Sequence, residues 1–169
     1  ISGSTPAASA YFSGNLTLTD SLLLVSAPSG RGLVAGDINN SSAKSSTIDA
    51  QRVTIVGTGA SNQIAAVAGD GGGTTGADHH TITIGDSIIA NIPTVASCNE
   101  PDAAATNTIA FATTAFPAGF STTNSCADGM GDPGITFGSG MTTQAPVFAD
   151  AAAGDYRQLR TSPLLDLGA

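Results

Sequence analysis

Charged and aromatic residues are scarce in this sequence. Of the 169 residues, 11% are charged and 5% are aromatic, and tryptophan is absent. Globular domains carry about 25% charged residues, and the solvent-facing sides of their helices hold many of them. The shortage of charge therefore argues against an α-rich fold. Serine, threonine, asparagine and glycine supply the polar surface instead, and these residues are typical of exposed strand positions and turns.

Large side chains and long apolar runs are scarce as well. The apolar residues, 41% of the chain, are mostly alanine, valine, isoleucine and leucine, which suit a narrow and regularly stacked interior. No segment reaches the roughly 18 consecutive apolar residues that a membrane-spanning helix needs. The sequence starts without an initiator methionine or a signal peptide, so we expect a mature product or an excised fragment.

Positive charge is also limited. Five lysines and arginines stand against 13 acidic residues, which gives a net charge of −8. Nucleic acids and anionic membranes bind to cationic patches, so we expect neither as the main partner. An acidic chain with so few lysines suits an extracellular protein.

The sequence contains only two cysteines, Cys98 and Cys126. They lack the paired C-x-x-C spacing of zinc ribbons, which argues against a metal site. We favour a disulfide that closes a loop between them. The alternative is two independent buried thiols.

An internal repeat is the clearest pattern in the chain. The tetrapeptide VAGD occurs at 34–37 and again at 67–70. Strand-like segments at 16–25, 46–56 and 81–89 alternate apolar and polar residues, as strands with one buried face do. Their drifting period of about 30 to 36 residues is typical of a solenoid whose coils stack to close the core. We therefore predict an all-β fold, the C-terminal part of a right-handed single-stranded parallel β-helix.

Alignment of the three segments predicts which residues stack on one another. It places Leu18, Ile48 and Ile84 in one column of a parallel sheet. Two further predicted columns are Leu23 with Val53 and Ile89, and Thr17 with Thr47 and Thr83. Arg52 aligns with Leu22 and Ile88, and we expect these three residues on an outer surface.

The repeat fades after the third segment, which suggests three regions within one domain. Residues 1–95 form the stacked coils. Residues 96–147 are interpreted as an irregular excursion with short strands, held by the disulfide. Residues 148–169 close the domain.

The C-terminal segment PVFADAAAGDYRQLRTSPLLDLGA contains the most specific motif. Its characteristic residues are Phe148, Gly154, Asp155, Tyr156, Leu159, Ser162, Pro163, Leu164, Leu165, Asp166 and Gly168. This pattern resembles the closing motif of bacterial secreted or surface β-helix proteins of the pectate-lyase-like superfamily, some of which carry a choice-of-anchor sorting signal. The family more often has Ala-Ile in place of the two leucines at 164–165. The resemblance implies the same fold and an extracellular or cell-surface location.

The chemistry of this closing motif indicates a structural role. A turn at 154–155 lets Tyr156 and Leu159 pack on the preceding coil. The Ser162 hydroxyl and the Asp166 carboxylate can accept hydrogen bonds from turn amides. Leu164 and Leu165 then return the chain to the core, after Pro163 has ended the strand.

Enzymes with this fold cleave polysaccharides by means of clustered carboxylates. The lyases hold Ca²⁺ and use an arginine or lysine as base, and the glycosidases need close acids on adjacent coils. The candidates here are Asp20, Asp49 and Asp86, with Arg52 nearby. Because the alignment puts Ala50 between Asp20 and Asp86, we predict no catalytic residue and no cofactor. Ca²⁺ is the one cofactor that the resemblance suggests, and no ligand set in the sequence supports it.

Two further segments resemble functional motifs only superficially. Asp78, His79 and His80 form the only histidine cluster, but adjacent strand residues point to opposite faces and do not chelate one metal together. We interpret the histidines as a solvated loop pair. The glycine-rich stretch at 69–76 lacks the GK[ST] ending of a phosphate-binding loop.

Two classes of function remain open. The favoured one is a non-catalytic extracellular or bacterial cell-surface scaffold that mediates adhesion or binds a polysaccharide or cell-surface glycan. The alternative is a polysaccharide lyase or glycoside hydrolase whose active coils lie partly outside this chain. The upstream sequence would discriminate between them, because an enzyme needs stacked acids there.

Overall fold

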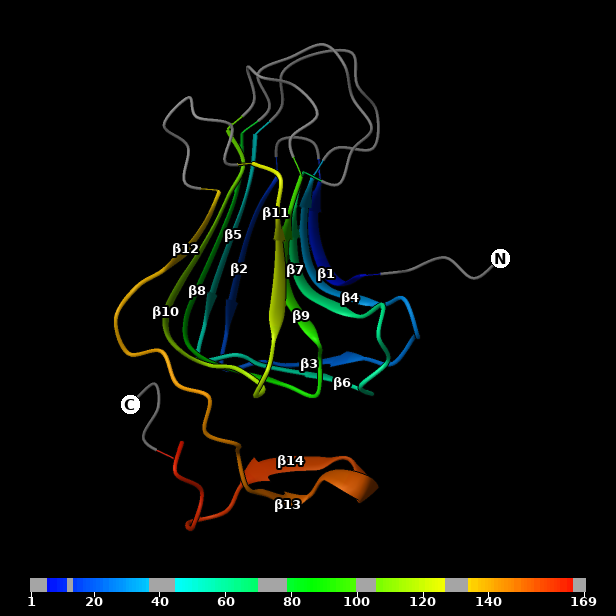
Figure 1. Cartoon of the computed structure of the whole chain (residues 1–169), viewed down its shortest axis with the longest axis vertical. Helices are drawn as coiled ribbons and strands as arrows, with labels where there is room; N and C mark the ends of the chain where they lie inside the picture. The colour runs from blue at the N-terminus through cyan, green and yellow to red at the C-terminus, as the bar shows by residue number, and fades with distance from the viewer. Residues whose placement is uncertain are drawn as a thin grey trace.

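The computed structural model describes residues 6–11, 14–36, 45–69, 79–99, 106–126 and 134–165, and these ranges are all β apart from one short 3₁₀ helix (Figure 1). The strands in the first half of the chain are β1 (Pro6–Tyr11), β2 (Asn15–Thr19), β3 (Leu22–Val25), β4 (Arg31–Gly36), β5 (Ser45–Gln51), β6 (Thr54–Gly57) and β7 (Ile64–Ala68). The others are β8 (His79–Ala90), β9 (Thr94–Cys98), β10 (Thr108–Ala115), β11 (Ser121–Asn124), β12 (Ile135–Phe137), β13 (Phe148–Asp150) and β14 (Asp155–Gln158), with the 3₁₀ helix η1 (Ala151–Ala153) between the last two.

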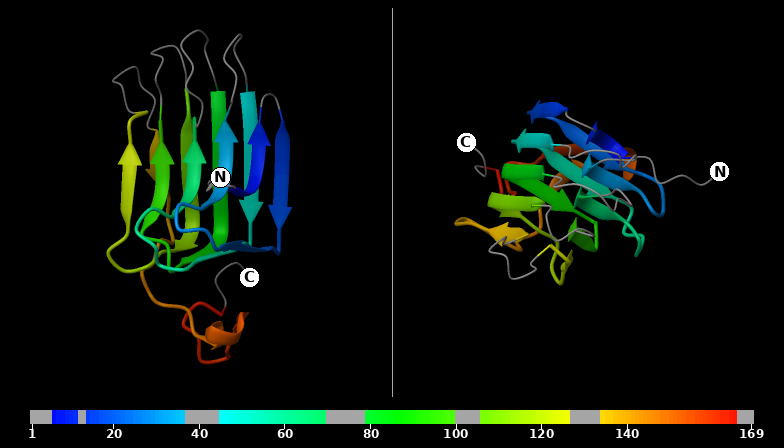
Figure 2. Two further views of the ribbon diagram at one scale, coloured as in Figure 1. Left: turned by 90° about the vertical axis from the view of Figure 1, so that its right-hand side faces the viewer. Right: turned by 90° about the horizontal axis from the view of Figure 1, so that it is seen from above.

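The strands up to β12 pair in parallel and follow the order of the chain. One sheet has the order β1-β4-β7-β9-β11, and the other has β2-β5-β8-β10-β12. The strands β3 and β6 form a third parallel ladder with the C-terminal part of β8. Each pass of the chain therefore adds one strand to each main sheet, and we term such a pass a rung. Figure 2 shows the rungs side by side. The predicted all-β class with parallel strands is confirmed.

The second sheet stacks its side chains in columns. One column holds Leu16, Ile48, Ile82 and Ile109, and the next holds Leu18, Ala50, Ile84 and Phe111. The sequence alignment is thus right that Leu18 and Ile84 share a column, but wrong by two residues in placing Ile48 between them. Ile48 and Ala50 are both fully buried. The small side chain of Ala50 gives the weaker hydrophobic signal, which explains the error.

The other two predicted columns carry the same two-residue error in the second rung. Leu23 and Ile89 are in line, as predicted, but Ile55 lies between them instead of Val53. Thr17 and Thr83 are also in line, with Asp49 in the place predicted for Thr47.

The core lies between the two main sheets and consists mainly of leucine, isoleucine, valine and alanine. Little space is left for a side chain at Gly32 of β4. A Cβ atom at this position would lie 2.4 Å from the Ala65 carbonyl oxygen of the neighbouring strand β7 and 3.0 Å from the Ile55 Cγ2 atom of β6. Glycine is therefore required at this position, because a side chain would collide with the backbone of the neighbouring strand.

The chain leaves the second sheet through a corner that recurs in successive rungs. Asp20, Arg52, Asp86 and Thr113 occupy this corner with φ angles of 49°, 53°, 50° and 46°. The Asp20 amide donates to the Gln51 carbonyl oxygen (3.2 Å), and the Arg52 amide donates to that of Gly85 (3.0 Å). Aspartate tolerates this left-handed backbone better than most residues do. The corner therefore carries Asp20, Arg52 and Asp86 on three consecutive rungs.

Strands β9 to β12 continue both main sheets as a fourth and a fifth rung. The interpretation of residues 96–147 as an irregular excursion is therefore wrong over these strands. Equivalent residues are 34 positions apart at Ser46 and His80, but 27 apart at Thr81 and Thr108. The shorter period hides the repeat from a search at constant spacing.

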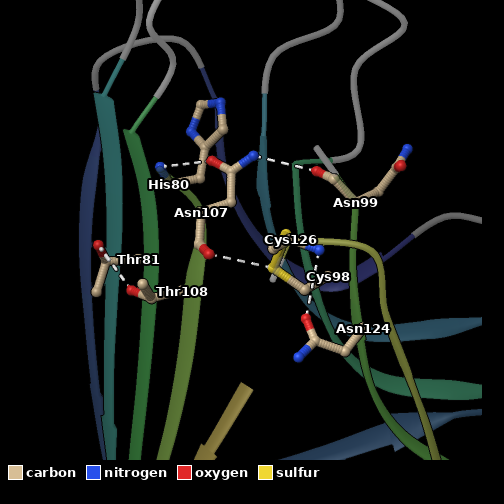
Figure 3. The surroundings of a disulfide bond; sticks show 8 residues. All are labelled: His80, Thr81, Cys98, Asn99, Asn107, Thr108, Asn124 and Cys126. Carbon is tan, nitrogen blue, oxygen red and sulfur yellow. Dashed lines mark hydrogen bonds between the residues drawn. A yellow bond between two sulfur atoms is a disulfide. The ribbon is translucent and has the colours of Figure 1, made fainter. Parts of the chain in front are cut away.

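Cys98 and Cys126 form a disulfide, as predicted. Cys98 ends β9, and Asn124 of β11 pairs with it two residues before Cys126, so the disulfide joins the fourth and fifth rungs. Asn107 lies beside it, donating to the Asn99 carbonyl oxygen (3.1 Å) and accepting from the His80 amide (2.9 Å) (Figure 3). The disulfide thus cross-links two neighbouring rungs, and both cysteines are buried.

The C-terminal segment packs on the outer face of the third ladder. Strands β13 and β14 form an antiparallel hairpin, and Gly154 ends its turn with a φ of 81°. Leu164 is buried against this face together with Val56, Ile88, Ala90 and Ala115, and Phe148 and Tyr156 pack on the same cluster. The Ser162 hydroxyl oxygen accepts hydrogen bonds from the amides of Val147 (3.2 Å) and Leu164 (3.3 Å), as predicted.

Three predictions about this region are wrong. Leu159 and Leu165 are 43% and 45% exposed, because the burial is carried by Leu164 and the two aromatic rings. Ile88 is buried under the C-terminal segment, not on the outer surface with Leu22 and Arg52. Its register partner Leu22, two rungs away, remains 47% exposed. Asp166 and Gly168 lie outside the described residues.

Candidate functional site

A groove of about 440 Å³ lies between the corner and the C-terminal hairpin. One side is lined by Asp20, Ser21, Leu22, Arg52 and Thr54, and the other by Gly154, Asp155, Tyr156 and Arg157. Figure 1 shows β13 and β14 beneath β3 and β6, which contribute Leu22 and Thr54. This volume is within the range of about 300 to 1,000 Å³ that small-molecule sites occupy.

An ion pair between Arg52 and Asp20 forms the wall on the corner side. The Arg52 Nε atom donates to Asp20 Oδ1 at 2.7 Å, and Nη2 donates to Oδ2 at 2.9 Å. This hydrogen bonding lowers the pKa of Asp20 and raises the pKa of Arg52, to which the charge of Asp86 also contributes. The sequence alignment wrongly puts Ala50 between the two aspartates. The corner shows that Arg52 occupies that place.

A second ion pair, between Arg157 and Asp155, forms the wall on the hairpin side. The Arg157 Nε atom donates to Asp155 Oδ1 at 2.9 Å, and Nη2 donates to Oδ2 at 2.6 Å. The Arg157 amide also donates to Asp155 Oδ1, at 3.2 Å. These hydrogen bonds lower the pKa of Asp155 from 3.8 to about 2. The Arg157 side chain is 84% exposed, so its remaining donors face solvent.

The lowered pKa values fix the charge of the groove. Because the pKa of Asp155 is lower in the folded chain, its pairing favours folding above about pH 3.8, and this contribution is lost as the pH falls toward 2. Exposed ion pairs contribute little to stability. Both ion pairs are therefore ionised at neutral pH and available to a ligand. The stability of the fold comes mainly from the hydrophobic core.

Other residues of the groove lining are less polar. Leu22 and Thr54 are neighbours in register on β3 and β6. The ring of Tyr156 packs edge-on against Phe148, with 5.3 Å between the ring centroids, and this contact fixes the tyrosine ring. The lining of the groove thus combines the apolar parts of Leu22 and Tyr156 with two Asp–Arg ion pairs.

The candidate residues from the sequence are only partly gathered in this groove. Asp20 and Arg52 line it, and Asp86 follows on the next rung of the corner. Asp49 accepts a hydrogen bond from the Gln51 side chain at 2.8 Å and does not line the groove. Asp155 and Arg157 belong to the closing motif, whose sequence indicates a structural role and does not predict a binding or catalytic site. Only the packing of the hairpin brings them opposite the corner.

The histidine pair lies elsewhere, at the start of β8. His79 is exposed and contacts the Thr106 hydroxyl, whereas His80 is 1% exposed and its Nδ1 atom lies 2.7 Å from the Ser46 hydroxyl oxygen. The two rings point to opposite faces, as predicted. The interpretation as a solvated pair is wrong for His80, which belongs to the strand. Asp78 and the rest of the glycine-rich stretch from residue 70 onward lie outside the described residues.

The described ranges contain neither a group of metal-binding side chains nor a membrane-spanning helix. Within those ranges, no three His, Cys, Asp or Glu side chains are grouped closely enough to hold a metal ion together. In the same part of the chain, no helix has the length and hydrophobicity that a membrane crossing requires.

Comparisons with known proteins return no relative of this chain. No family model, no curated protein and no solved structure matches it.

Proposed function

We propose that this chain is part of an extracellular right-handed parallel β-helix that binds polysaccharide without cleaving it. Parallel rungs that follow chain order are what stacked β-helix coils produce. A buried disulfide suits an oxidising compartment, and the closing motif resembles that of bacterial surface β-helix proteins. These features support a location on the bacterial cell surface or in the medium around the cell.

The observation that carries the proposal is that two Asp–Arg ion pairs and the side chains of Leu22 and Tyr156 line the same groove. A sugar ring has apolar C–H faces and a rim of hydroxyl groups. The Leu22 and Tyr156 side chains can pack against such a face. The hydroxyls can then donate to the ionised carboxylates and accept from the arginines, and hydrogen bonds to charged groups are stronger than neutral ones.

The protonation state of the groove favours binding over hydrolysis. A glycosidase needs one carboxylic acid that is still protonated at the working pH, and its pKa is accordingly raised. Here the arginines lower the pKa of both Asp20 and Asp155. Both carboxylates are therefore hydrogen-bond acceptors at neutral pH and poor proton donors.

Replacement of Arg157 by alanine should weaken glycan binding about tenfold. Hydrogen bonds to charged groups contribute about 1.5 to 3 kcal/mol, and tenfold corresponds to about 1.4 kcal/mol. The fold should remain intact because Arg157 is 84% exposed. The measurement is calorimetric titration of both proteins with a glycan that binds the wild-type chain on a glycan array.

Arg160→Ala is the matched control, since Arg160 is an exposed arginine three residues away that does not line the groove. It should bind like the wild type. A parallel assay should detect no release of reducing ends or unsaturated sugars, with or without Ca²⁺. Release that Arg52→Ala abolishes would show that the chain is an enzyme and overturn the proposal.

A further inference from the structure

We infer that the groove selects neutral sugar chains and rejects polyuronates. Asp20 determines this specificity by pairing with Arg52, and Asp86 by adding negative charge beside it. The inference rests on the proposed function, because it names the class of glycan for the same groove.

The first argument is the charge of the site. Asp20 with Arg52 and Asp155 with Arg157 form two ion pairs with no net charge. Asp86 takes the place next to Arg52 on the following rung of the corner, because Gln51 and Gly85 pair in register just before them, and it adds a further negative charge there. The corner is therefore net negative, in a chain whose overall charge is −8. A uronate chain carries one carboxylate per sugar and is repelled here, whereas a neutral chain is not.

The second argument is the geometry of the two guanidinium groups. Arginine binds a carboxylate best through two parallel N–H donors. The Nε and Nη2 atoms of Arg52 already donate to both carboxylate oxygens of Asp20. Those of Arg157 donate in the same way to Asp155. A uronate carboxylate would have to displace Asp20 or Asp155 to form the same fork. The remaining N–H donors and the aspartate lone pairs match a hydroxyl, which both donates and accepts.

The corner backbone allows a clean test of the specificity residues. Asp20 and Asp86 have φ angles of 49° and 50°, and asparagine is among the few residues that tolerate this conformation. The double variant Asp20→Asn with Asp86→Asn therefore keeps the corner and removes both charges beside Arg52. Asp49→Asn is the control, since it removes one acid of the same sheet outside the groove.

The experiment measures affinities by calorimetry in EDTA, so that no metal ion bridges two carboxylates. The probes are neutral pentasaccharides of glucose, mannose, galactose and xylose, and a galacturonate pentasaccharide. The wild-type chain and Asp49→Asn should bind at least one neutral probe about tenfold more tightly than the galacturonate probe. The double variant should gain about tenfold for galacturonate, and added salt should weaken this new binding.

The outcomes separate this inference from the proposed function. Wild-type binding of galacturonate as tight as that of every neutral probe would overturn the specificity while leaving glycan binding in place. A folded double variant with no gain for galacturonate would also overturn it. Absence of binding to all five probes and to the glycan array would overturn both.

Discussion

Replacing Ile82 by alanine should lower the free energy of unfolding by about 2 to 5 kcal/mol, the usual cost of truncating a large core side chain. Ile82 is fully buried in the column between Ile48 and Ile109. The strands on both sides hold its backbone in register, so the surroundings can collapse only slightly into the cavity. The measurement is urea unfolding followed by circular dichroism.

Leu16→Ala is the matched control because Leu16 stands at the end of the same column. It is only half-buried, with one described neighbour in the column, so its truncation should cost clearly less. Equal losses in the two variants would mean that this column does not run through the core as the register describes.

Removal of the disulfide by the double change Cys98→Ala and Cys126→Ala should cost about 3.5 kcal/mol, from the loop-closure entropy of the unfolded chain. The bond closes a segment of 28 residues and joins the fourth and fifth rungs. For a domain of this size the loss corresponds to a melting temperature lower by about 10 °C.

Thr123→Ala is a suitable control for the cysteine variant, since Thr123 is an exposed residue of β11 between the two cysteines. Its melting temperature should stay close to that of the wild type. Two free thiols in the non-reduced wild-type protein, measured by mass shift after alkylation, would contradict the disulfide itself.

The internal repeat, together with the alternation of apolar and polar residues, was sufficient to predict parallel stacked strands. This pattern placed residues in the correct column only where large side chains face the core. In the second rung, Ala50 takes a core position between Leu18 and Ile84, and a pattern search prefers the larger Ile48 nearby. The register of a strand depends on packing against both neighbours, which a single sequence reports only through side-chain size.

The candidate site was less predictable than the sheets. The corner ladder of Asp20, Arg52 and Asp86 follows from the correct register, and the two-residue error concealed it. The opposite wall needed the position of the hairpin, which depends on Leu164 and Tyr156 packing on the third ladder. Contacts between residues so far apart in sequence leave no local pattern to find.

The most direct test of the glycan-binding groove is an NMR titration that follows backbone amide shifts as a bound oligosaccharide is added. The largest changes should occur at Ser21, Thr54 and Gly154, which line the groove from both sides. A second hollow, of about 210 Å³ and lined by residues such as Asn91 and Phe120, should show little change. Shifts concentrated at that second hollow, with the groove amides unmoved, would contradict the account.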